Sequence, residues 1–150
     1  MASNELQQIL SESATEVLES MFFTSPLESS AFCDGPTENS IAAGLFFRGT
    51  PPGRFGICAS MDAARSLAAS FLGEDLESMG EQQCGEVICE LANMVCGSVL
   101  SRLEKDVLFE LTQPKIGEPY SSRPEGASVS LTLELEEGSL LAWILVEEAR

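Results

Sequence analysis

The chain has 150 residues, the length of one ordinary domain, which we expect to span residues 1–150 and to bury its core without disulfides or a metal site. Eight Lys and Arg against 24 Asp and Glu give a net charge of −16, which argues against binding to nucleic acid or to an anionic membrane. The sequence contains no histidine, which excludes histidine-based catalysis and histidine-containing metal sites. The acidic N-terminal segment is unlike a secretory signal, and no apolar run of about 18 residues is present, so we expect a cytoplasmic protein with no membrane span.

The first predicted element is a helix over residues 3–22, because apolar residues recur there at spacings of three and four while glutamates lie mostly on the other side. Pro26 stops this helix. The turn-rich segment that follows is expected to contain a short strand around residues 27–33. Residues 40–48 and 54–59 then have the composition of strands and flank a Gly- and Pro-rich stretch, which predicts a hairpin.

A second helix is predicted over residues 61–72, with Gly73 as its C-terminal stop. An acidic connection leads to the clearest element, a long helix over roughly residues 81–106 with one apolar face. A Pro- and Gly-rich loop then leads to a hairpin with strands at residues 127–135 and 140–146.

The alternating pattern of the last hairpin implies a sheet with one buried face and one more polar face. Three cysteines of the long helix, Cys84, Cys89 and Cys96, are interpreted as small apolar filling rather than as metal ligands. Aromatic residues in strand patterns are expected in the core: Phe46, Phe47, Phe55 and Trp143. The predicted fold class is α+β, with two layers in which a mainly antiparallel, twisted sheet packs against two long helices.

A narrow polar stripe runs along the long helix and consists of Glu86, Glu90, Asn93 and Gly97. Each helical residue advances about 100°, so these positions fall within about 60° of one another and opposite apolar residues such as Leu91. Glycine within a helix costs about 1 kcal/mol relative to alanine, and a position without a side chain allows another backbone or a ligand to approach. The stripe is therefore a candidate docking surface with an amide at its centre. A solvated helix face that carries glutamates without any function has the same spacing.

The first helix repeats this spacing with Glu12, Glu16 and Glu19. Each of the two long helices is also followed by sheet-forming segments. The repetition suggests two related halves, and coincidence at so few positions is the alternative.

Residues 86–97 read Glu-Val-Ile-Cys-Glu-Leu-Ala-Asn-Met-Val-Cys-Gly. This run resembles the signature helix of the CheC/CheX/FliY chemotaxis phosphatases, which has an acid or serine, then Glu, then Asn at these intervals. The most specific part of the match is Glu90-x-x-Asn93. Residues 44–49, 55–60 and 63–73 are similar to the hairpin, helix and terminating glycine of the same family.

The chain is most similar to the CheX-like branch, because the CheC branch typically has the motif in both halves. Here Glu19 stands where a second Asn would be. Two further positions depart from the family pattern. Glu86 stands where Asp or Ser is common, and the family's proline beyond the Asn is matched only loosely by Pro114 or Pro119.

The resemblance implies a CheC-like fold and a cytoplasmic hydrolase that removes the aspartyl phosphate from a CheY-like response-regulator receiver domain. Asn93 would orient the attacking water and Glu90 would pair with the receiver's lysine, while Glu86 and Gly97 would belong to the docking surface. The chain would need no cofactor of its own, because the receiver supplies a divalent ion such as Mg²⁺. The family pairs sheet edges or swaps strands, so a homodimer is also expected.

Two other functions remain open from the sequence. One is a catalytically silent adaptor of the same fold that binds signalling or flagellar-switch partners. The other, unrelated, is a structural dimer whose acidic surface only aids solubility.

Overall fold

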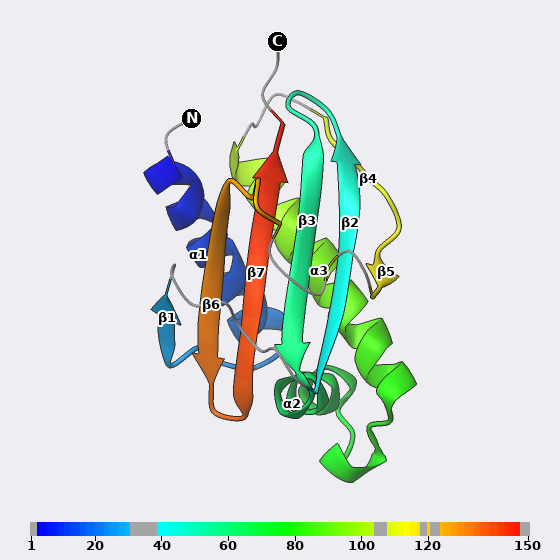
Figure 1. Cartoon of the computed structure of the whole chain (residues 1–150). Helices are drawn as coiled ribbons and strands as arrows, with labels where there is room; N and C mark the ends of the chain where they lie inside the picture. The colour runs from blue at the N-terminus through cyan, green and yellow to red at the C-terminus, as the bar shows by residue number, and fades with distance from the viewer. Residues whose placement is uncertain (1–2, 31–38, 104–107, 118–119, 121–123, 148–150) are drawn as a thin grey trace.

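Two long helices, α1 (Ser3–Met21) and α3 (Glu81–Leu103), lie side by side on one face of an antiparallel sheet (Figure 1). The computed structural model describes residues 3–30, 39–103, 108–117, 120 and 124–147. Within these residues the sheet has seven strands in the order β1-β6-β7-β3-β2-β4, with β5 also paired to β2. The predicted α+β fold, with a mainly antiparallel sheet on two long helices, is confirmed.

The strands of the sheet are β1 (Glu28–Ser30), β2 (Ser40–Arg48), β3 (Gly53–Ser60), β4 (Glu110–Leu111), β5 (Lys115–Ile116), β6 (Val129–Leu135) and β7 (Gly138–Val146). A third helix, α2 (Met61–Leu72), connects β3 to a single 3-10 turn, η1 (Leu76–Ser78), that precedes α3. Both predicted hairpins are present, because β2 pairs with β3 and β6 pairs with β7.

The core lies between the helices and the inner face of the sheet. The apolar side of α1 is buried there, and the buried residues of α3 recur at helical spacing on one side of the helix. These α3 residues include Val87, Ile88, Leu91, Val95 and Val99. Because this side of α3 is buried, the position of the opposite side is determined by the packing of the core.

The two halves of the chain, from α1 to β3 and from α3 to β7, have a similar arrangement of one long helix and a strand hairpin. The central strands β3 and β7 are antiparallel and each belongs to one hairpin. The short strand β1 of the first half pairs with β6 of the second half, and β4 and β5 of the second half pair with β2 of the first. In the same way, α1 contacts β6 and α3 contacts β2. This exchange is the arrangement that two related halves would produce, as the repeated glutamate spacing suggests.

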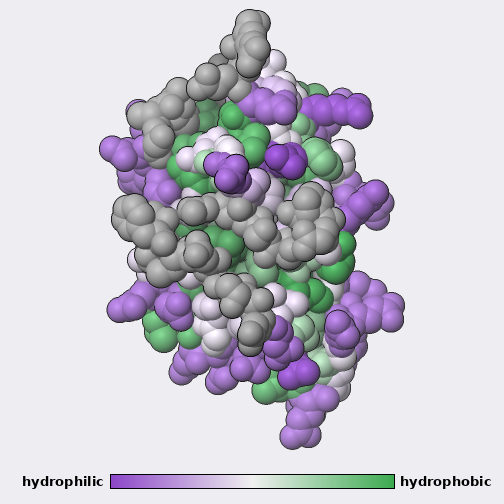
Figure 2. Space-filling view, viewed as in Figure 1, coloured by the Kyte–Doolittle hydropathy of each residue, from purple (hydrophilic) through white to green (hydrophobic). Residues whose placement is uncertain are grey.

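The outer face of the sheet, predicted to be the more polar of the two, also holds a cluster of buried apolar residues. Ser130 and Thr132 of β6 point to this face and are nonetheless buried. Trp143, which pairs with Ser130, is also fully buried and stacks on Tyr120 with ring centroids 6.3 Å apart. Gly56 lies opposite Trp143, where an added Cβ would be only 2.5 Å from the indole. A second, smaller apolar cluster therefore covers this face, and hydrophilic residues form most of its outline (Figure 2).

The aromatic residues divide between the two faces. Phe47 and Phe55 are buried in the main core, as predicted, while Trp143 belongs to the outer cluster. Phe46 is 48% exposed, which contradicts its predicted place in the core. The reason is the alternation of β2, because Leu45 and Phe47 point inward and the residue between them points outward.

The element boundaries differ from the predicted ones in a few places. The long helix predicted to reach residue 106 is described to Leu103, and residues 104–107 lie outside the described part of the chain. Only Glu28–Ser30 of the strand expected at residues 27–33 is seen as β1, and residues 31–38 also lie outside the described part. The acidic connection before α3 contains η1, which the sequence did not indicate.

By length and composition alone, α3 is sufficiently apolar to cross a membrane, because its best 18-residue window has a mean hydropathy of 1.3. The expectation concerned an uninterrupted apolar run, and Glu86 and Glu90 interrupt α3, so the helix is apolar only in its average composition. Of that window, 56% is buried inside the protein. Burial against the sheet accounts for the apolar composition of α3.

Ser60 joins α2 to the β6–β7 hairpin. Its Oγ accepts hydrogen bonds from the backbone N–H of Ala63 at 3.3 Å and of Ser139 at 3.2 Å. The first bond caps the N-terminus of α2, and the second holds the start of β7 against it. One hydroxyl thus satisfies two backbone donors from different elements.

We expect Ser60→Ala to lower the free energy of unfolding by about 1–2 kcal/mol, because both N–H donors lose their acceptor. Urea unfolding followed by circular dichroism measures this loss. Ser78→Ala is the matched control, since its hydroxyl bonds only the backbone oxygen of Asp75, at an exposed site. A loss for Ser60→Ala no larger than that of the control would contradict the double role of this residue.

Candidate functional site

The outward side of α3 carries the polar stripe identified in the sequence. Glu86, Glu90 and Asn93 are exposed and Gly97 is half-buried. All four lie on the side of the helix opposite the residues that pack on the sheet. The structure therefore brings the four predicted site residues together on one surface of one rigid element.

The polar side chains of the stripe are available for a partner. Among the described residues, Glu86, Glu90 and Asn93 form no side-chain hydrogen bond or ion pair. Glu86 and Glu90 are one helical turn apart, so two carboxylates point into solvent next to an amide. Their negative field is felt by Cys89: burial raises the pKa of this thiol, and the carboxylates of Glu90 and Glu86 raise it further.

The chemical capacity of the stripe is limited and specific. An asparagine amide can both donate and accept hydrogen bonds, but it is not a base, while the carboxylates can pair with a cation. No three His, Cys, Asp or Glu residues of the described chain are arranged to hold a metal ion. The stripe can therefore orient a small polar molecule and bind a cationic group.

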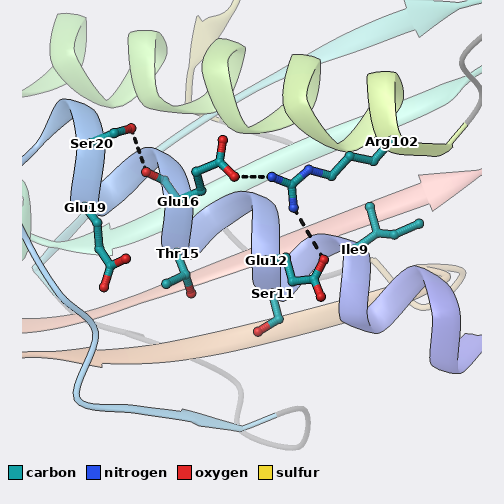
Figure 3. Close-up of a pocket in the computed structure, with 8 residues that line it drawn as sticks. All are labelled: Ile9, Ser11, Glu12, Thr15, Glu16, Glu19, Ser20 and Arg102. Atoms are coloured by element: carbon teal, nitrogen blue, oxygen red, sulfur yellow. Dashed lines mark hydrogen bonds and ion pairs between the residues drawn. The ribbon is translucent and has the colours of Figure 1, made fainter.

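On α1 the corresponding residues are Glu12, Glu16 and Glu19, and two of these carboxylates already have an ion-pair partner within the chain. Arg102, in the last turn of α3, forms ion pairs with Glu16 and with Glu12, the latter at 3.5 Å (Figure 3). These two glutamates are the counterparts of Glu90 and Glu86 in the repeated spacing. Glu19, the counterpart of Asn93, lines the same surface hollow of about 1070 Å³. The Arg102 guanidinium thus neutralises two carboxylates on α1, whereas their counterparts on α3 have no ion-pair partner among the described residues.

Sequence reasoning missed the role of Arg102. Eighty-six residues separate it from Glu16, and the contact forms only because α1 and α3 pack side by side. The sequence does place Arg102 near the C-terminus of a helix, where a positive charge is favourable, and this is a local indication of an electrostatic role. That signal does not identify the partner helix.

The cysteines of α3 are confirmed as apolar filling at two of the three positions. Cys84 and Cys96 are fully buried, and burial raises the pKa of both thiols. Cys89 is half-buried and lies beside the stripe, at the boundary between the core and solvent.

Comparisons with known proteins identify a family and a set of similar folds. The profile of the family described as "Chemotaxis phosphatase CheX" matches residues 41–136. No curated protein matches the sequence. Among solved structures, the chemotaxis protein CheX from Vibrio vulnificus superposes with a TM-score of 0.77 at 19% identity, covering 98% of this chain and 99% of that one.

Two further structures are similar over almost their whole length. CheX from Desulfovibrio desulfuricans has a TM-score of 0.72 at 16% identity, covering 95% of this chain and 99% of its own. A chain of the CheX–CheY–BeF3–Mg²⁺ complex from Borrelia burgdorferi also has a TM-score of 0.72 at 16% identity, covering 94% of this chain and 97% of its own. At sequence identities of 16–19%, the similarity to these three structures establishes the fold alone.

The half-buried Gly97 can be tested for a purely structural role. Apart from the adjacent residues and the local backbone of α3 itself, no described atom lies within 4 Å of the Cβ that alanine would add there. The position is helical, so Gly97→Ala should raise the free energy of unfolding by about 0.5–1 kcal/mol. Urea unfolding measures the change. Gly56→Ala is the contrasting variant and should be destabilised, because its Cβ would lie 2.5 Å from Trp143. If Gly97→Ala also lost stability, the glycine would serve the fold and not an approaching partner.

Proposed function

We propose a function from one premise: this chain belongs to the CheX family of chemotaxis phosphatases, whose profile includes α3 and its stripe. The proposed activity is hydrolysis of the aspartyl phosphate of a CheY-like receiver domain. The observation that carries the proposal is the exposed Asn93, which has no hydrogen-bond partner among the described residues, with Glu90 one turn away on a helix fixed by the core.

The proposed reaction needs little from this chain beyond positioning. The oxygen of a water molecule attacks phosphorus, the bond between phosphorus and the aspartate oxygen breaks, and the receiver's carboxylate and inorganic phosphate are released. The transition state of such a transfer is loose, so strong proton abstraction is not required. The receiver supplies a divalent ion and a lysine that neutralise the phosphoryl oxygens, and what it lacks is an oriented water.

Asn93 supplies that orientation in the proposal. Its amide donates to and accepts from one water molecule and holds it in line with the breaking bond. The amide is uncharged, so it does not repel the phosphoryl group as a carboxylate at this position would. This property separates Asn93 from its counterpart on α1, Glu19.

The remaining stripe residues form the docking surface. The Glu90 carboxylate pairs with the receiver's lysine and sets the register of the two proteins. Glu86 extends the negative surface by one turn, and Gly97 allows the receiver backbone to come close to the helix. The CheX–CheY–BeF3–Mg²⁺ complex supports a receiver partner, because it contains a chain of this fold together with CheY.

The assembly and location of the chain are part of the same proposal. The described edges of the sheet are short: β1 has three residues, and β4 and β5 have two each. Short edge strands limit non-specific sheet pairing, and we propose, from the family resemblance alone, that the chain is a cytoplasmic homodimer. The chain requires no cofactor of its own.

Asn93→Ala should lower the rate of receiver dephosphorylation by about 100-fold or more while leaving receiver affinity nearly unchanged, because only the orientation of water is lost. Release of phosphate from a phosphorylated CheY-like receiver measures the rate. Binding of the same receiver loaded with beryllofluoride measures the affinity. Glu19→Ala is the control, as the equivalent position on α1, and should behave as wild type. An Asn93→Ala variant as fast as wild type would contradict the mechanism, and a wild type that binds without hydrolysis would be an adaptor.

Glu90→Ala should act mainly on association, since it removes one partner of a charge-assisted pair. We expect the Kd for the beryllofluoride-loaded receiver to rise about tenfold. Isothermal titration at two salt concentrations measures the affinity and its electrostatic part, which should shrink in the variant. Equal affinity and equal salt dependence in wild type and variant would exclude a docking role for Glu90.

A further inference from the structure

A groove of about 600 Å³ borders the stripe on the side that faces the edge of the sheet. It lies where α3 passes β5, which Figure 1 shows at the edge of the sheet beside that helix. Its walls come from α3, from the start of β2 and from β5. Glu86 and Cys89 line it from α3, so the groove and the stripe share a residue.

The floor of the groove is apolar. Ile41, Gly85 and Ile116 meet there, and the Cβ missing from Gly85 would lie 3.4 Å from the Cδ1 atoms of both isoleucines. Ile116 is 48% exposed although it belongs to a strand, because β5 has only two residues and nothing described covers it. Exposed apolar surface of this kind beside a polar docking surface is typical of a contact site.

The rim of the groove is acidic. Glu81 and Glu86 both line it, and none of its ten lining residues is Lys or Arg. An occupant therefore has to be apolar where it meets the isoleucines and neutral or cationic where it meets the rim. A receiver that docks its lysine on Glu90 satisfies the second condition, because Glu86 lies one turn from Glu90 and reaches both surfaces.

We infer that the groove is the specificity pocket for the receiver: it takes an apolar side chain that the receiver carries next to the basic residue docked on the stripe. The inference rests on the proposed function. The pocket contributes affinity and selects among receivers by the size of that side chain, and it takes no part in the hydrolysis.

Cys89 provides a direct test on the unsubstituted chain, since its thiol lines the groove and is half-buried. Alkylation by iodoacetamide is followed at Cys89 by peptide mass spectrometry, with and without a CheY-like receiver loaded with beryllofluoride and Mg²⁺. At a receiver concentration about ten times its Kd, the alkylation rate should fall about tenfold. A cysteine introduced by Ser20→Cys, on exposed α1, is the control and should react at the same rate in both samples.

Substitution of Ile116 tests the contribution to affinity. Ile116→Ser should raise the Kd for the receiver about five- to tenfold and leave the hydrolysis rate at saturating receiver unchanged, because apolar contact area is lost away from the reacting atoms. Ile116→Leu, which keeps an apolar side chain of similar size, should bind the receiver with nearly wild-type affinity. Phe46→Ser is the matched control, since Phe46 has the same 48% exposure and does not line the groove.

Three results would overturn the inference. One is a Cys89 that stays reactive in the complex, and another is an Ile116→Ser variant with wild-type affinity. The third is protection of Cys89 that grows with the concentration of the chain alone, which would assign the groove to a second copy. Hydrolysis by the wild type is measured first: if it is present, these results reject the pocket alone, and if no receiver is dephosphorylated, the proposed function fails and the pocket with it.

Discussion

The burial of one side of α3 is the constraint on which the rest of the structure depends. Val87, Ile88, Leu91, Val95 and Val99 are all buried against the sheet or its neighbouring helices. Their burial fixes the rotation of the helix about its own axis, and with it the direction of every other side chain on α3. The stripe faces solvent for this reason. A site that works by positioning needs such a support, because small displacements of the orienting group are costly to the rate.

The two long helices have equivalent places in the fold but present different charges to a partner. Their stripes have the same spacing and both lie on the outer side of the helix layer, but Arg102 neutralises the carboxylates of α1. In the proposed docking, a receiver's lysine would compete with that guanidinium on α1, whereas the carboxylates of Glu86 and Glu90 on α3 have no ion-pair partner among the described residues. The α1 stripe also carries a third carboxylate, Glu19, where α3 has an amide. This difference in charge supports α3, rather than α1, as the docking helix of the proposed function.

Much of the fold and the candidate site could be predicted from the sequence because both depend on local periodicity. The 3.6-residue period gave α1 and α3, Gly73 ended α2 as expected with a φ of 66°, and the outward direction of Asn93 followed from the apolar face alone. The covered outer face, the exposure of Phe46 and the Arg102 pairs did not follow. Each depends on residues far apart in the chain, such as Tyr120 over Trp143 or α1 beside α3, which hydropathy patterns do not encode.

The central claim is that the Asn93 amide orients the water that attacks a receiver's acyl phosphate. The structure of this chain bound to a receiver loaded with beryllofluoride and Mg²⁺ tests it most directly, since beryllofluoride stands in for the phosphoryl group. The account predicts the Asn93 side chain within hydrogen-bond distance of a water that lies opposite the bond from beryllium to the aspartate oxygen. A complex in which the receiver binds elsewhere, or in which Asn93 is far from the beryllofluoride, would contradict it.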